Sequence, residues 1–272
     1  MKNPVIVAIF LMLSLFGLDA KMPGQTDFVV VIPSFNNEKY CLNCLHSLAT
    51  QTYPYWQAIY INDCSTDRTG ALVEAYVHKY NLGNKIKVVH NKKNVGAMAN
   101  FYTWIHKIDP THVVVHLDGD DKLAHTKVLE TLAHTYADKS VWMTYGSYRP
   151  EPDDFVRVCA PFPEWVLQKN AFRDYAWVSS HLRSYYAKLF HNIKKKHFMY
   201  KGAFVPMACD LAIMFPILEQ SSNNHIRYIP DELYIYNYQT PINDVKKDLS
   251  LILEVDKQIR KMNRYKPLKK LF

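Results

Sequence analysis

Runs of apolar residues alternate with amphipathic segments along most of the chain and predict alternating strands and helices. Continuous apolar runs rich in β-branched residues are typical of strands that are buried on both faces of a sheet. The segments between them repeat apolar residues at a helical period. We predict strands at 28–33, 56–63, 85–91, 111–118 and 141–148, and helices within 38–51, 65–80, 95–108 and 125–138.

The connections between these predicted elements are short, which favours an α/β fold with a doubly wound, mostly parallel sheet. Ligands bind such sheets outside the carboxyl ends of the strands. Polar residues follow each of the first four predicted strands, among them Asp63 after the second and the crowded acids Asp118, Asp120 and Asp121 after the fourth. Turns also favour Asp and Asn. Polar residues at the carboxyl ends of all four strands, which meet at one edge of the sheet, nevertheless predict a binding site there.

Composition narrows the classes of function. An apolar fraction of 49% in 272 residues predicts a packed core. The chain has only 8 glycines and contains neither G-x-G-x-x-G nor a P-loop motif, which argues against dinucleotide and P-loop chemistry. Five scattered cysteines do not predict a disulfide framework.

The formal net charge of +8 is concentrated in Lys194–Lys196 and in the last residues. Such an excess suits an anionic substrate, nucleic acid or a lipid surface. A solvated helix face is the simplest interpretation of these runs, whereas a basic amphipathic end predicts contact with an anionic membrane surface. We predict no nucleic-acid partner.

The first twenty residues form a separate segment. An apolar run from Val5 to Leu18 follows Lys2. As a helix this run would span roughly 20 Å, short of the ~30 Å hydrocarbon core of a bilayer. Its length predicts a signal peptide at 1–20, with a short membrane anchor or a buried helix as alternatives. A signal peptide or a short anchor would imply an exported, secretory-pathway or membrane-associated protein. A buried helix would leave the cytoplasmic face of a membrane as the expected location.

Crowded carboxylates repel one another, and a divalent cation would relieve that repulsion. Asp118 and Asp120 alternate along extended chain, so their side chains can face one site. A basic protein with an acidic cluster therefore predicts a phosphate-bearing substrate that is bridged by a hard divalent cation such as Mg²⁺.

Four segments resemble, in order and spacing, the motifs of the family 2 glycosyltransferases of GT-A fold: VVVIPSFNNEKY, YINDCSTDRTG, NKKNVGAMANFY and HLDGDDKL. Each motif alone is weak, but four in register are specific. The resemblance covers residues 27–150 well and the rest thinly. It implies a Rossmann-like GT-A sheet with an acceptor-side C-terminal subdomain, and inverting transfer of a sugar from a nucleotide diphosphate sugar, UDP-linked by expectation, to an acceptor hydroxyl.

The resemblance also implies roles for single residues. Asp63 would accept a hydrogen bond from the nucleobase, Asp118 would lie near the ribose, and Asp120 would hold the metal, Mn²⁺ or Mg²⁺. Asp121 would bind the donor sugar or cap the following helix. Asn62 and Cys64 depart from the usual residues around Asp63. The complete donor-binding set that it implies is Pro33, Ser34, Asn36, Glu38, Asp63, Asn94, Asp118 and Asp121.

Removal of the acceptor proton needs a base. The resemblance points to Asp210 in MACDLAIMFPILE, where Cys209 replaces a common Glu. Asp210 could instead be an acid that merely favours a helix N-terminus. The rival bases are Asp153, Asp154 and Asp174.

Two further motif positions differ from the family. Gln239 stands where many members have a His, so metal coordination is expected to rest on Asp120, phosphate and water. The chain lacks Q-x-x-R-W, the motif of processive members, which predicts single addition.

The predicted organisation is a nucleotide-sugar half at 27–150, an acceptor and catalytic-base half at 151–245, and a basic helix or tail at 246–272. Within the second half, the aromatic-rich segment 162–190 is predicted to lie on the acceptor side, with a helix at 181–190. His181 or Arg183 could contact phosphate there, although ordinary structural roles are favoured.

Two other functions stay open. A metal-dependent nucleotidyltransferase would share the acidic sheet edge but normally has a glycine-rich loop after the first strand. A non-catalytic nucleotide-sugar or glycan-binding domain would not need Asp120 or Asp210. The acceptor, whether glycan, lipid-linked or protein, is also left open.

Overall fold

The computed structural model describes residues 25–152, 159–222, 224–240 and 244–272. The predicted N-terminal leader and the rival bases Asp153 and Asp154 lie outside the described residues. Within those ranges, every helix is too short or too polar to cross a bilayer.

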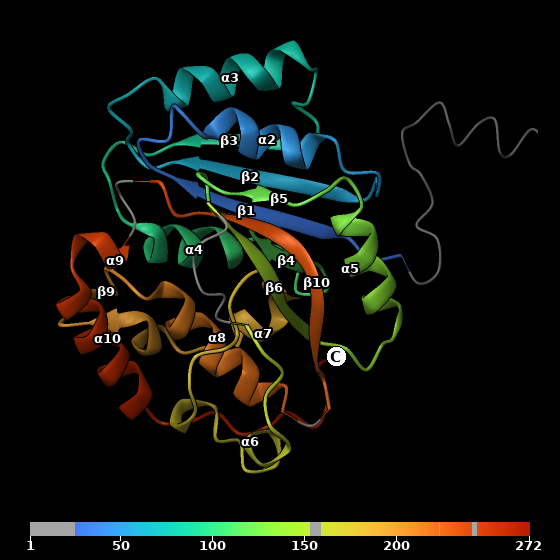
Figure 1. Ribbon diagram of the computed structural model, residues 1–272, viewed down its shortest axis with the longest axis vertical. Coiled ribbons are helices and arrows are strands. Elements are labelled where there is room, and N and C mark those ends of the chain that lie inside the picture. Colours follow the sequence, from blue (N-terminus) through green and yellow to red (C-terminus); the bar gives the residue numbers. More distant parts are fainter. Residues whose placement is uncertain (1–24, 153–158, 223, 241–243) are drawn as a thin grey trace, which may run out of the picture.

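An eight-stranded sheet forms the centre of the molecule, in the order β3-β2-β1-β4-β7-β6-β10-β5 (Figure 1). Its strands are parallel except β7, which is antiparallel to β4 and β6, and β5, which is antiparallel to β10. The predicted mostly parallel α/β sheet is thus confirmed, and both predicted halves contribute strands to it. The strands are β1 (Phe28–Ser34), β2 (Trp56–Asn62), β3 (Ile86–His90), β4 (Val113–His116), β5 (Lys122–Leu123), β6 (Met143–Glu151), β7 (Ser184–Tyr186) and β10 (Ile226–Asn237).

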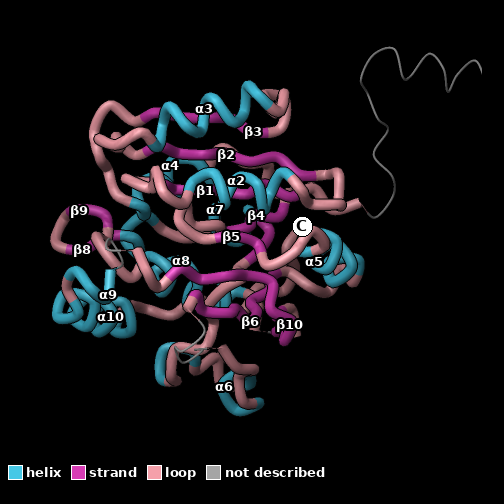
Figure 2. The backbone as a smooth tube through the Cα atoms, turned by 45° about the horizontal axis from the view of Figure 1, so that its top comes forward, coloured by secondary structure: helices cyan, strands magenta, loops and turns pink. Residues whose placement is uncertain are grey.

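Helices cover both faces of the sheet (Figure 2). The first face carries α2 (Cys41–Ala49), α3 (Thr69–Lys79) and α5 (Val128–Ala137), and the second carries α4 (Ala97–Ile105), α7 (Ala187–His191), α8 (Cys209–Gln220) and α10 (Leu249–Lys261). All of β1 is buried, and its side chains alternate between the faces. Val30 packs in the same cluster as Leu45 of α2, and Val31 packs with Phe101 of α4. This two-sided burial explains the continuous apolar run.

Smaller elements complete the second face. They are α6 (Glu164–Gln168), α9 (Asp244–Lys247), the hairpin of β8 (Met199–Tyr200) and β9 (Ala203–Phe204), and the 3₁₀ turns η1 (Phe172–Asp174) and η2 (Lys195–Phe198).

A buried ion pair joins α8 to η1 and α10. Arg173 Nη2 donates to Glu219 Oε2 at 3.0 Å, and Arg173 Nη1 donates to the carbonyl of Ile259. Glu219 Oε2 also accepts the backbone N–H of Tyr265 at 2.9 Å. Both charged side chains are almost fully buried. The segment after α10 is therefore attached directly to α8.

The helix predicted at 181–190 is wrong in its first half. Ser184–Tyr186 form β7, and a helix begins only at Ala187. Ser184 and Tyr185 are buried between β4 and β6, where Tyr185 pairs with Val114 and with Met143. Because β7 runs antiparallel to β4, the residues that precede β7 lie at the carboxyl end of β4.

Candidate active site

A cavity of about 460 Å³ lies at the carboxyl ends of β1, β2 and β4. It is bordered on the second face by α4, by the start of α8, and by Ile252 of α10. The structure brings seven of the sequence-predicted site residues to its wall: Pro33, Ser34, Asp63, Asp118, Asp120, Asp121 and Asp210.

Asp63 follows β2 and is held by the loop that leads into α4. Its Oδ1 accepts from Asn91 Nδ2 at 2.7 Å, and its Oδ2 accepts the backbone N–H of Gly96 at 2.8 Å. The N–H of Val95 lies 3.0 Å from Oδ1. Gly96 has φ 83°, a conformation that favours glycine. These donors keep the carboxylate in one orientation on the cavity wall.

Three of the predicted donor-binding residues lie outside the cavity lining. Asn36 Oδ1 accepts the N–H of Thr66 at 2.8 Å, and Glu38 Oε2 accepts the N–H of Arg68 at 3.1 Å. These bonds join the loop after β1 to the loop after β2. Asn94 is exposed. Asn36 and Glu38 therefore stabilise the shape of these two loops.

The acidic loop after β4 is fixed from two sides. Asp121 Oδ2 accepts from the Tyr234 hydroxyl at 2.6 Å, and Oδ1 accepts the N–H of Asn237 at 2.7 Å. A Cβ on Gly119 would lie 2.4 Å from Ser34 Oγ, so the loop can pass this close to β1 only with glycine there. Burial raises the pKa of Asp121 well above its usual range, and repulsion from the neighbouring aspartates adds to this.

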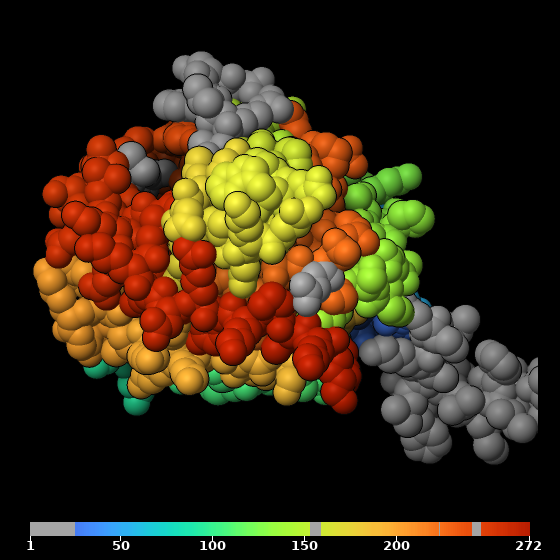
Figure 3. Space-filling model, turned by 90° about the horizontal axis from the view of Figure 1, so that it is seen from below, coloured from blue at the N-terminus to red at the C-terminus, as the bar shows by residue number. Residues whose placement is uncertain are grey.

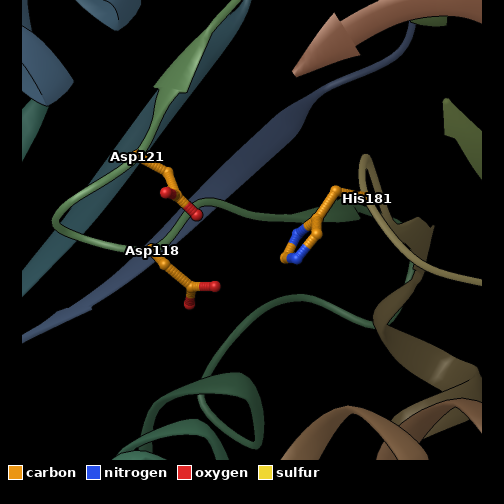
Figure 4. A group of neighbouring side chains, drawn as sticks. All are labelled: Asp118, Asp121 and His181. Carbon is orange, nitrogen blue, oxygen red and sulfur yellow. The ribbon is translucent and has the colours of Figure 1, made fainter. Parts of the chain in front are cut away.

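His181 joins the acidic loop. Asp118, Asp121 and His181 offer ligand atoms that all lie within 4.8 Å of one another. Figure 4 shows the two carboxylates and the imidazole facing a common space. Burial, aided by the charge of Arg183, lowers the pKa of His181 well below its usual value, so the ring is neutral and able to bind a metal. Carboxylates and neutral imidazoles are both ligands of divalent metal ions.

The sequence singled out Asp120 as the metal ligand. Asp120 lines the same cavity but is not part of this group of three. Gln239 lines an adjoining cavity of about 260 Å³ together with Asp120 and Asp121. His116 also lines the cavity, but the histidine of the group of three is His181, from the segment before β7, which the sequence offered only as a phosphate contact.

Arg183, also from that segment, lies between the acidic loop and α8. Its Nη1 is 3.5 Å from Asp210 Oδ2, and its Nη2 is 4.0 Å from Asp118 Oδ2. Nη2 also lies 2.9 Å from His181 Nδ1. Burial alone would lower the pKa of Arg183, but pairing with Asp210 and Asp118 raises it. The guanidinium is therefore a permanent charge that links the two sides of the cavity.

Asp210 lies in the first turn of α8. The preceding Ala208 has φ 54°, in the left-handed region, where the chain turns into the helix. The Asp210 side chain is 29% exposed, which leaves it accessible from the cavity. The rival base Asp174 is paired with Arg264 at 2.6 Å and lies outside the cavity lining.

The cavity carries an excess of negative charge. Five carboxylates line it, and Arg183 is the one Lys or Arg side chain among its described lining residues. A diphosphate would be repelled by such a wall unless a divalent cation lay between them. The site therefore fits a metal-bridged anionic ligand better than a bare anion.

The family model for "Glycosyl transferase family 2" matches residues 29–206. TuaG of Bacillus subtilis (strain 168), a putative teichuronic acid biosynthesis glycosyltransferase, is 31% identical over 119 residues, which are 44% of this chain and 45% of TuaG. The poly(ribitol-phosphate) β-N-acetylglucosaminyltransferase TarS of Staphylococcus aureus (strain Mu50) is 35% identical over 96 residues, 35% of this chain and 16% of TarS. The chain covers less than half the length of these curated relatives.

Solved structures share the fold. S. aureus TarS 1–349 in complex with UDP-GlcNAc matches with a TM-score of 0.64 and 20% identity, over 86% of this chain and 65% of that one. The mannosyltransferase PcManGT from Pyrobaculum calidifontis, in complex with GDP-Man and Mn²⁺, matches with a TM-score of 0.58 and 17% identity, over 96% of this chain and 77% of that one. Since the family model also spans more than half of the chain, this protein belongs to the family 2 glycosyltransferases.

Proposed function

We propose that the protein is an inverting glycosyltransferase that moves one sugar from a nucleotide diphosphate sugar to an acceptor hydroxyl. The observation that carries this proposal is the single cavity that combines Asp63, the acidic loop, His181 and Asp210. A donor-binding carboxylate, a cation site and a candidate base then lie around one space. The nucleotidyltransferase hypothesis has no comparable support in this arrangement.

The donor would lie along the strand ends. Asp63 would accept a hydrogen bond from the nucleobase through the remaining acceptor capacity of its oriented carboxylate. Asp118 would lie at the ribose, as the family resemblance implies. The UDP-GlcNAc complex of TarS supports a UDP-linked donor, and the GDP-Man complex of PcManGT makes GDP the alternative to test.

Mn²⁺ or Mg²⁺ would be held by Asp118, Asp121 and His181, with Asp120 on the same wall. When bound, the cation would neutralise charge that develops on the leaving diphosphate. The residues of this chain supply the rest. Tyr234 and the Asn237 N–H hold Asp121 in place, and Arg183 lies against His181.

Asp210 would take the proton of the acceptor hydroxyl as the oxygen attacks the anomeric carbon. The bond from that carbon to the diphosphate oxygen breaks in the same displacement, which inverts the carbon and needs no covalent enzyme intermediate. Arg183 would orient Asp210 from 3.5 Å away. In this scheme Asp210 removes the proton, so no group of the donor or the acceptor has to act as the base.

The acceptor and the cellular location are proposed only as classes. The names of TuaG and TarS support a glycan-polymer acceptor. Residues 1–20 are proposed as a signal peptide or short anchor, which N-terminal sequencing of the mature protein would test.

The central test is a donor screen with Mn²⁺ that measures released nucleoside diphosphate and pyrophosphate separately. Release of UDP or GDP on sugar transfer supports the proposal, and release of pyrophosphate would establish nucleotidyl transfer instead. Asp210→Asn should abolish transfer while UDP binding with Mn²⁺ persists, and Asp174→Asn should behave as the parent. Normal transfer by Asp210→Asn would show that the base lies elsewhere.

A further inference from the structure

One side of α10 presents four exposed residues in a single stripe. Leu249, Leu253, Lys257 and Lys261 follow one another at intervals of four, which places them along one side of a helix. The leucines are 54% and 59% exposed, whereas Val255 and Ile259 on the opposite side are buried in the core. The stripe is therefore apolar in its first half and basic in its second.

The acids of α10 are neutralised, but the lysines of the stripe are not. Glu254 pairs with Lys201 at 3.1 Å, and Asp256 pairs with Arg260 at 2.7 Å. Among the described residues, no carboxylate lies within ion-pair distance of Lys257 or Lys261. The exposed side of α10 is consequently positive beside its two leucines.

The same helix borders the proposed active site. Ile252 lines the cavity, and it lies between Leu249 and Leu253 in the sequence. Asp210 lines the cavity from the neighbouring α8. Figure 1 shows α10 at the outer edge of the molecule, and Figure 3 shows the red C-terminal segment on the molecular surface. The helix that carries the stripe therefore also borders the cavity, through a residue on a different side of the helix.

We propose that this stripe docks the protein on an anionic lipid surface. Leu249 and Leu253 enter the boundary between headgroups and acyl chains, while Lys257 and Lys261 contact headgroup phosphates. Charge complementarity favours this occupant over a second copy of this basic chain, since two such stripes would repel each other.

Docking on the stripe brings α10, the helix that also borders the cavity, to the lipid surface, where a lipid-linked acceptor would be presented. The inference goes beyond the proposed function because binding to lipid requires no sugar transfer. Asp210→Asn should retain full vesicle binding even though it abolishes transfer, so the two proposals can fail separately.

The test is flotation of the full chain with vesicles of phosphatidylcholine alone or mixed with phosphatidylglycerol. Lys257→Gln and Lys261→Gln should each weaken binding to anionic vesicles about fivefold. The double change Leu249→Ser, Leu253→Ser should weaken it about tenfold. The matched control is Tyr80→Ser with Lys79→Gln at the end of α3, an exposed aromatic and lysine remote from α10, and it should bind like the parent.

A second measurement removes any contribution of the N-terminal apolar segment, which all variants share. Leu253→Trp should be quenched by brominated anionic lipids beyond the parent, and Tyr80→Trp should not. Absence of extra quenching in Leu253→Trp would overturn the proposal. So would leucine-dependent self-association in sedimentation without lipid, which would show that a second copy covers the stripe.

Discussion

The Nη1 atom of Arg183 lies 3.5 Å from the Oδ2 atom of Asp210, although the two residues come from different elements. Arg183 precedes β7, and Asp210 opens α8. The guanidinium is buried and charged, so it restricts the position of a carboxylate that would otherwise be mobile at a helix start. We infer that Arg183 is a positioning residue for the proposed base.

Arg183→Met should therefore lower kcat about a hundredfold, because small misplacements of a reacting group cost rates of that order. Steady-state kinetics at saturating donor would measure this effect. A matched control is Arg227→Met, which removes an exposed arginine paired with Asp138 at 3.0 Å. If the variant changes only the KM of the donor, Arg183 binds the diphosphate and does not position Asp210.

His181→Gln should reduce the affinity for Mn²⁺ at least about tenfold, because it removes a neutral imidazole from the group with Asp118 and Asp121. Titration of Mn²⁺ by electron paramagnetic resonance, in the presence of UDP, measures this directly. His112→Gln is the control, since His112 lies near Asp27 and outside the cavity lining. Unchanged affinity in His181→Gln would assign metal binding to the aspartates alone.

His197 predicts a loss of stability in mild acid. Burial, with smaller contributions from Arg173 and nearby lysines, lowers its pKa to about 4. The unfolded chain takes up a proton below pH 6.5 that the folded protein does not, so stability is complete above pH 6.5 and decreases toward pH 4. We expect a loss of about 3 kcal/mol from this residue. Urea unfolding at several pH values should show a shallower decrease for His197→Phe, and equal slopes would contradict this assignment.

Because Arg173 and Glu219 form a buried ion pair, we expect a single substitution in the pair to lower the free energy of unfolding more than a double substitution does. Arg173→Met leaves the Glu219 carboxylate buried without its partner and should lower the free energy of unfolding by about 3–5 kcal/mol. Arg173→Met combined with Glu219→Leu should recover much of this loss, because no buried charge remains.

Urea unfolding of both proteins measures the difference. Arg264→Gln breaks the exposed pair with Asp174 and should cost about 1 kcal/mol or less. A double variant no more stable than Arg173→Met would mean that other contacts of Arg173, such as that with the Ile259 carbonyl, dominate.

The sequence pattern was sufficient for the parallel strands β1, β2, β3, β4 and β6. The apolar runs of β1 and β4 are buried on both faces, and that of β2 is buried on one face and partly on the other, so the ends of these strands could be located. Residues that follow parallel strands meet at one edge, which is why Asp63 and the acidic loop were found together.

His181 and Arg183 could not be located in the same way. They precede an antiparallel strand of three residues, and only the insertion of β7 between β4 and β6 brings them opposite Asp118. A run as short as Ser184–Tyr186 followed by a helix carries little periodic signal. The available clue was a histidine and an arginine two residues apart in the sequence.

The hydrogen bond from the Tyr265 N–H to Glu219 has a consequence for folding during translation. The N–H of Tyr265 and that of Leu268 are bonded to consecutive residues at the end of α8, Glu219 and Gln220, while α8 carries Asp210 at its other end. During translation, α8 is synthesised before Tyr265 and Leu268, the residues that are bonded to its end. Nascent chains stalled before Tyr265 should therefore be cleaved readily by protease near α8, and chains stalled after Leu268 has emerged should resist.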